Sequence, residues 1–207
     1  MANGTGTPAG ELTYASLGEV KEYIGITGSE HDEMLTAMIA AACAVIDHLC
    51  RRTFKAPPVE ETRLFDGRGG SLLLIDDAQS VSGVKLDLDG DGVREYDLDS
   101  SYYVLGPRNK LPKLWVELLP SSPVDFPKTP ASVEITGLWG YGYEVPQPVK
   151  EACKLMVARA FKRKDTAFAT QLASPEMGGF RVERQVDPDV IQMLKPYRRT
   201  RLRILVP

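Results

Sequence analysis

The chain has 207 residues, of which 43% are hydrophobic and 26% charged, and its formal net charge is −3. This composition is ordinary for a globular protein with a core of its own, and the small negative charge argues against bulk nucleic-acid binding. No apolar run approaches the roughly 20 residues that span a bilayer. The first residues lack the cationic start and apolar centre of a signal peptide. We therefore expect a protein without a membrane partner.

Two long helices with matching patterns are expected on either side of a β-rich stretch. They cover Asp32–Thr53 and Val149–Lys164, where apolar residues recur three and four positions apart and a cationic cluster closes each segment. A short helix is expected after Ser16, because Glu19 three residues later completes a capping box. Another short helix is expected after Asp187. Together these segments predict a small bundle of about four helices.

The stretch from residue 59 to residue 140 predicts an antiparallel β domain inserted between the two long helices. Short apolar segments alternate there with glycine and proline turns, and Asp89-Gly90-Asp91-Gly92 is typical of a hairpin turn. The expected strands are 62–65, 72–75, 81–88, 102–105, 114–118 and 132–136. The fold class is therefore α+β, with an extended C-terminal arm. The expected parts are a disordered N-terminus (1–13), two parts of a helical core (14–58 and 141–195), the β-rich insertion (59–140) and the arm (196–207).

Three cysteines form no disulfide framework in the sequence. Cys43 and Cys50 are seven residues apart on one expected helix, about 10 Å along its axis, which is too far for a disulfide between them. Cys153 lies on the other long helix. We expect buried thiols in a reducing compartment.

The acidic run Asp87-Leu-Asp89-Gly-Asp91-Gly92 is the sharpest local motif. Alternating carboxylates before a glycine are how calcium loops begin, because a hard cation prefers several oxygen ligands from one tight turn. The twelfth position of such a loop should be glutamate, but here it is Leu98, and the flanking segments are expected strands. A solvated hairpin turn is the favoured interpretation, and a weak metal site at Asp87, Asp89 and Asp91 is the alternative.

No other segment carries a catalytic pattern. His31 and His48 lie in no metal-ligand spacing, and the glycine run Gly67–Gly70 is not followed by the Lys-Ser/Thr of a phosphate loop. The aromatic turn Trp139–Tyr143 is interpreted as a cap on the core, with a ligand platform as the alternative. We expect a protein that is not an enzyme and needs no cofactor.

The last residues alternate cations with aliphatic side chains. This pattern predicts a strand that adds to an exposed sheet edge on another subunit. A tail folded back on its own domain is the first alternative, and a nucleic-acid site formed with Lys162–Lys164 is the second. The residues expected to carry binding are Tyr197, Arg198, Arg199, Arg201, Leu202, Arg203, Ile204, Leu205 and Val206.

Two segments together resemble a known family. They are residues 16–54, from Ser16-Leu17-Gly-Glu19 to Arg51-Arg52-Thr53-Phe54, and residues 137–164, with Val145-Pro146-Gln-Pro148 before the second long helix. They resemble the head–tail connector (adaptor) proteins of tailed phages, the gp6-like family. The resemblance covers about a third of the chain, and this chain departs from shorter members by its large β insertion.

The resemblance implies a structural virion protein assembled in the host cytoplasm. Members form a homo-oligomeric ring, usually of twelve copies, under the portal protein of the capsid. The ring extends the channel through which genomic DNA passes without sequence reading, and it offers a platform to the next head-closure or tail protein. Carried to this chain, the portal-binding segment is Pro196–Pro207. The alternatives are a calcium-binding interaction module on the Asp87–Asp91 loop and a nucleic-acid-binding protein.

Overall fold

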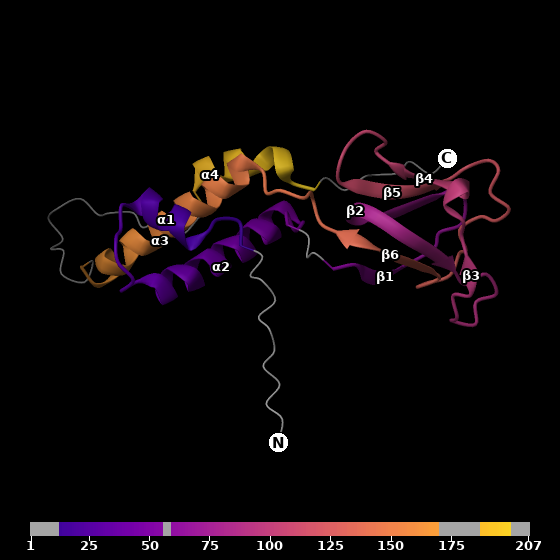
Figure 1. The fold of residues 1–207 in the computed structure, drawn as a ribbon, viewed down its shortest axis with the longest axis horizontal. Helices are drawn as coiled ribbons and strands as arrows, with labels where there is room; N and C mark the ends of the chain where they lie inside the picture. The colour runs from indigo at the N-terminus through magenta and orange to yellow at the C-terminus, as the bar shows by residue number, and fades with distance from the viewer. Residues whose placement is uncertain (1–12, 56–58, 170–186, 200–207) are drawn as a thin grey trace, which may run out of the picture. The chain divides into compact units, whose positions relative to one another are not determined.

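The computed structural model describes residues 13–55, 59–169 and 187–199 (Figure 1). It divides into a helical unit, formed within Met1–Arg52 and Val145–Pro207, and a β unit, Thr53–Glu144. The β unit is therefore inserted into the sequence of the helical unit. The helices and the antiparallel sheet confirm the α+β class. The expected disordered N-terminus, up to residue 12, and the arm from residue 200 onward lie outside the described residues.

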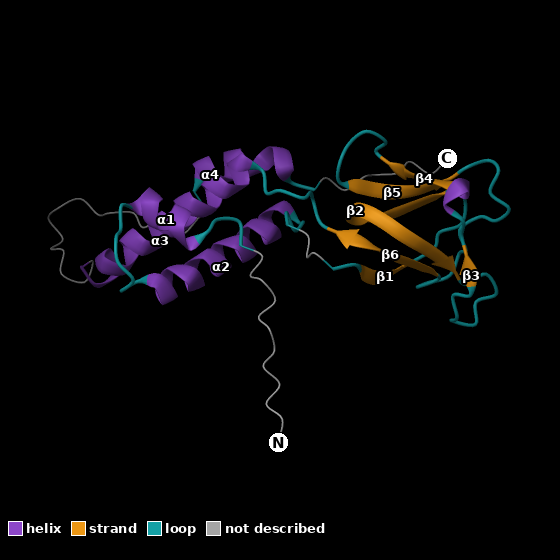
Figure 2. Ribbon diagram, in the orientation of Figure 1, coloured by secondary structure: helices purple, strands orange, loops and turns teal. Residues whose placement is uncertain are grey.

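The described residues of the helical unit form four α-helices, and Figure 2 shows them as coiled ribbons. They are α1 (Leu17–Ile24), α2 (Asp32–Cys50), α3 (Gln147–Ala169) and α4 (Pro188–Leu194), and the short 3₁₀ helix η2 (Lys195–Tyr197) follows α4. The capping box of α1 is confirmed, since the Ser16 hydroxyl accepts the N–H of Glu19 and the Glu19 carboxylate accepts the N–H of Ser16. Gly25 ends α1 at a φ of 78°, a conformation that glycine adopts without strain.

Packing of the helical unit centres on α3, which contacts α1, α2 and α4. The side chains buried between these four helices are largely aliphatic or small, which lets the helices approach closely. They include Val20, Leu35, Ile39, Ala42, Cys43, Ile46, Cys50, Val149, Ala152, Cys153, Val157, Val190 and Leu194. The expected burial of all three cysteines is confirmed.

Helix α2 is long and apolar enough to cross a membrane, which differs from the expectation that no segment reaches this limit. Its alanines raise the mean hydropathy over 19 residues without adding large apolar side chains. Residues along its length, from Leu35 to Cys50, are buried against other helices of the same unit. This packing favours the core helix of a globular unit, since such helices meet the same limit.

The described residues of the β unit form six strands, which are β1 Glu61–Phe65, β2 Leu72–Leu86, β3 Tyr96–Asp97, β4 Tyr103–Gly106, β5 Lys113–Leu118 and β6 Val133–Trp139. They make one antiparallel sheet in the order β1-β6-β2-β5-β4, and β3 pairs with β2 off this path. The 3₁₀ helix η1 (Ser100–Tyr102) precedes β4. The sheet places strands distant in sequence side by side, because β1 and β2 both pair with β6.

Strand β2 corrects the expectation of two separate strands at 72–75 and 81–88. It is continuous from Leu72 to Leu86, with its first part paired to β5 and its second part to β6. The register shifts between Leu74 and Ala78, and again between Ala78 and Gly83. These irregularities interrupt the alternation of apolar side chains along the strand. The sequence of one continuous strand therefore has the pattern expected of two strands with a turn between them.

Strand β6 runs further than the expected strand 132–136 and ends at Trp139, the first residue of the expected aromatic turn. Within this strand, position 137 requires glycine, because a Cβ there would lie 2.2 Å from the carbonyl oxygen of Ser80 on β2. The Trp139 indole is buried and donates a 2.7 Å hydrogen bond to the carbonyl oxygen of Glu61. Its role in the core agrees with the interpretation of this segment as a cap. The core of the sheet also contains Leu73, Ile75, Val84, Leu86, Val116, Phe126, Val133 and Ile135.

Candidate functional sites

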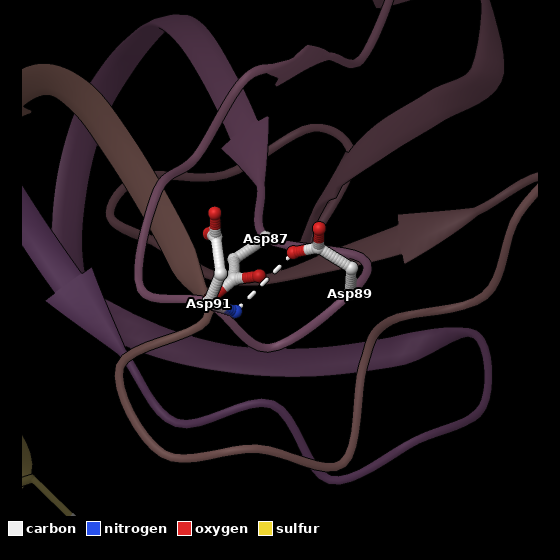
Figure 3. Close-up of side chains that lie close together, drawn as sticks. All are labelled: Asp87, Asp89 and Asp91. Atoms are coloured by element: carbon white, nitrogen blue, oxygen red, sulfur yellow. Dashed lines mark hydrogen bonds between the residues drawn. The ribbon is translucent and has the colours of Figure 1, made fainter.

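The acidic turn lies between β2 and β3 and brings the three predicted carboxylates together (Figure 3). One oxygen from each of Asp87, Asp89 and Asp91 lies within 4.8 Å of the others. Asp87 is buried, whereas Asp89 and Asp91 are exposed. The N–H of Asp87 donates a 2.9 Å hydrogen bond to the carbonyl oxygen of Ser132, the residue directly before β6.

The three carboxylates accept hydrogen bonds from backbone N–H groups of the turn. Asp87 accepts the N–H of Gly90 at 2.7 Å and that of Gly92 at 2.9 Å, one on each carboxylate oxygen. Asp89 and Asp91 each accept the N–H two residues further on. Desolvation raises the pKa of Asp87, but the Gly90 and Gly92 N–H groups outweigh it, so the pKa lies below its ordinary value. The turn is therefore stabilised by hydrogen bonds within the chain, as the hairpin interpretation requires.

The other motifs considered in the sequence have structural surroundings. His31 makes an edge contact with Phe161, with ring centroids 5.3 Å apart, and neither histidine joins a group of three potential metal ligands in the described part of the chain. The N–H groups of Gly67 and Gly69 donate to the carbonyl oxygens of Thr129 and Pro127. Because these donors are directed at the protein itself, the glycine run has no cradle for a phosphate.

The root of the arm is fixed to the C-terminus of α2. The N–H of Arg199 donates a 2.8 Å hydrogen bond to the carbonyl oxygen of Cys50, the last residue of α2. Of the predicted binding residues, Tyr197 ends η2 and is partly buried, and Arg198 is exposed. Arg201, Leu202, Arg203, Ile204, Leu205 and Val206 lie outside the described residues. The described part of the predicted arm therefore ends at Arg199, against the last turn of α2.

A cluster of arginines surrounds this root, which the sequence did not indicate. Arg51 and Arg52 directly follow α2, and Arg198 and Arg199 reach the same end from the far end of the chain. Burial raises the pKa of the Cys50 thiol to about 11, although the charges of Arg52 and Arg198 act in the opposite direction. Cations at this position interact favourably with the negative end of the helix dipole. The predicted basic tail thus starts inside a wider basic region.

Two further features were not predicted. An open groove of about 440 Å³ lies among α1, α3 and α4, lined by Tyr23, Gln147, Pro148, Glu151, Leu155 and Met193. The Sγ atoms of Cys43 on α2 and Cys153 on α3 lie 3.9 Å apart. The sequence could show that these two cysteines occupy apolar helical faces, but only the packing of α2 on α3 brings them together.

The described residues therefore form an α+β protein with an inserted sheet and a basic root for a C-terminal arm, and they bring together no catalytic constellation of the kinds considered above. Residues 13–200 match the sequence model of the head completion protein family, and the chain belongs to this family. The match confirms the resemblance to phage head–tail connector proteins. The family description refers to completion of the head, which is not a class of enzyme.

Solved structures with a similar fold come from gene transfer agent particles. A chain in the neck of an empty particle, determined with C6 symmetry, has a TM-score of 0.59 and 18% identity, covering 95% of each chain. A chain in the virion of the native particle gives 0.60 and 18%, covering 96% of this chain and 94% of that one. A chain in the native neck, determined with C12 symmetry, gives 0.59 and 17%, covering 95% and 94%. No curated protein matches the sequence.

Proposed function

We propose that this protein is a structural subunit of the neck of a phage or phage-like particle. Copies of it form a closed ring, of twelve subunits, under the portal of the head. The ring extends the channel for the genomic DNA and gives an attachment surface to the next head-closure or tail protein. The observation that carries the proposal is the family match over residues 13–200, nearly the whole chain.

The similar folds support a place in the neck. Chains of the same fold were determined in necks with C12 and C6 symmetry, and both symmetries accommodate a ring of twelve. Neighbouring subunits of a closed ring contact each other through two different surfaces. The helical unit and the β unit offer such different surfaces within one chain.

The arm is the segment that we assign to the portal. Residues 200–207 follow Arg199 in the sequence, and the Arg199 backbone is hydrogen-bonded to the end of α2. At the end of α2 lie four arginines, which are Arg51, Arg52, Arg198 and Arg199, and the sequence after them contains two more, Arg201 and Arg203. A basic and aliphatic segment of this kind binds by adding a strand to an exposed sheet edge and by pairing with acidic side chains.

The test is assembly with the portal protein of the same particle. Native mass measurement of the mixture should show a complex with the full-length chain, and none with a chain truncated after Arg199. Replacement of Leu202 and Ile204 by serine should weaken the complex, since these side chains lie on one face of the proposed strand. A full-length chain that stays outside the portal complex, and is absent from micrographs of the particle neck, would falsify the proposal.

A further inference from the structure

We propose that Cys43 and Cys153 form an oxidation site, at which a two-electron oxidant converts two thiols into a disulfide that joins α2 to α3. The two Sγ atoms lie 3.9 Å apart in the helical unit. A disulfide requires a separation of about 2 Å, so the sulfur atoms have to approach by roughly another 2 Å. Rotation of the two side chains about their Cα–Cβ bonds supplies movement of this size.

Small residues beside the two cysteines favour close packing of α2 and α3. Cys43 and Cys153 are each preceded by a buried alanine, Ala42 and Ala152, and these small side chains allow α2 and α3 to pack closely. Cys153 is fully buried, and Cys43 keeps an exposed fraction of 7%. A small oxidant therefore has its access at Cys43, with Cys153 directly behind it.

The two sulfur atoms differ in the way that the reaction requires. The hydrogen bond from Cys153 and the N–H of Tyr14, at 3.3 Å, lower the pKa of Cys43 against the effects of burial and of Asp47. The same sulfur contact and burial raise the pKa of Cys153. Cys43 is thus the better nucleophile, because the thiolate is the reactive form.

With hydrogen peroxide as the oxidant, the reaction proceeds in two steps. The Cys43 thiolate attacks one peroxide oxygen and breaks the O–O bond, giving a sulfenic acid and, after protonation of the leaving hydroxide, water. The Cys153 sulfur then attacks the sulfenic sulfur, the S–S bond forms, and the hydroxyl leaves as a second water with the proton from Cys153. In total two thiols lose two electrons and two protons, and one peroxide becomes two waters.

The bond would close a loop that contains the entire β unit. Cys43 and Cys153 are 110 positions apart, and the unit Thr53–Glu144 lies between them. Such a bond restricts the unfolded chain and makes the helical unit harder to open. If the protein is a neck subunit, as proposed above, the thiols are reduced during assembly in the host cell and meet oxidants after the particle is released.

The experiment uses the purified full-length protein and does not depend on its place in a particle. The protein is treated with hydrogen peroxide, alkylated under denaturing conditions and digested with trypsin without reduction. Trypsin releases Cys43 and Cys50 in the peptide 22–51 and Cys153 in the peptide 151–154. We expect these two peptides to be joined, with a mass about 2 Da below their sum because two hydrogens are lost. Dithiothreitol should separate them.

Matched variants identify the pair. The Cys50→Ser variant should form the same link, since Cys50 lies two helical turns from Cys43. The Cys43→Ser and Cys153→Ser variants should lose it. The inference is overturned if wild type and Cys50→Ser are both fully alkylated after oxidation, if Cys43 becomes sulfinic acid without a link, or if the link persists in Cys43→Ser.

Discussion

The backbone N–H of Arg199 donates a 2.8 Å hydrogen bond to the carbonyl oxygen of Cys50. Cys50 is the last residue of α2, and the final carbonyls of a helix have no partner within the helix. A residue from the far end of the chain therefore caps α2. This contact joins the last described residue of the C-terminal segment to the end of α2 in the helical unit.

Two truncations should separate these roles. A chain that ends after Lys195 loses the Arg199 donor as well as η2, and its free energy of unfolding should fall by about 1 kcal/mol or more, since a lost hydrogen bond is worth about that much. A chain that ends after Arg199 should unfold like the full-length protein. Chemical denaturation followed by circular dichroism measures both. Equal midpoints for the two truncated chains would show that the root does not stabilise the helical unit.

Local signals in the sequence predicted the helical unit well. The capping box at Ser16 and the glycine at position 25 act within a few residues, so the beginning and end of α1 could be read directly. The N-terminus of α4 was equally accessible, because Asp187 accepts the N–H of Asp189 just before the helix. Such features depend on neighbours in sequence and not on the rest of the fold.

Features that depend on distant partners could not be predicted. The continuity of β2 is decided by its pairing with β5 and β6, and the register shifts around Ala78 conceal it in the sequence. Cys43 contacts Cys153, and the charges of Arg52 and Arg198 both act on Cys50, because packing brings together segments more than a hundred residues apart in the sequence. The predicted arm from Arg201 to Val206 lies outside the described residues, and its role stays a prediction.

The capping box predicts a defined response to acid. The pKa of Glu19 lies below its ordinary value of 4.5, chiefly because its carboxylate accepts the backbone N–H and then the hydroxyl of Ser16. A carboxyl group whose pKa is lower in the folded state stabilises the fold fully above its ordinary pKa, and this contribution is lost as the pH falls through the lower folded value. In the Glu19→Gln variant we expect less loss of stability below about pH 4.5 than in wild type.

Replacement of Ser16 by alanine tests the other half of the capping box. It should lower the free energy of unfolding by about 0.5–2 kcal/mol at neutral pH, because the N–H of Glu19 loses its acceptor. Replacement by aspartate keeps an acceptor and serves as the control. Thermal unfolding at several pH values measures these variants together, and identical acid profiles for wild type and Glu19→Gln would contradict the role of the carboxylate.

The acidic turn should depend on Asp87 for its conformation. Asp87→Ala removes the acceptor of two N–H groups at a buried position, so the β unit should lose about 1–3 kcal/mol of stability. Asp89→Ala, at an exposed position, should change stability by no more than about 0.5 kcal/mol. Chemical denaturation should give the same order of stability for wild type, Asp89→Ala and Asp87→Ala with and without millimolar calcium. A large calcium-dependent gain that both variants abolish would instead support the metal site.

The close approach of β6 to β2 at Gly137 should tolerate no side chain. A Cβ at this position would lie 2.2 Å from the Ser80 carbonyl oxygen, which belongs to the backbone and cannot move without separating two paired strands. Gly137→Ala should therefore lower the free energy of unfolding by about 1–3 kcal/mol or more. Gly83→Ala is the matched control, because Gly83 also lies in the β2–β6 pairing but a Cβ added there would meet no atom within 4 Å. Urea denaturation of the two variants should differ clearly, and equal midpoints would mean that the two strands separate at Gly137 without a measurable loss of stability.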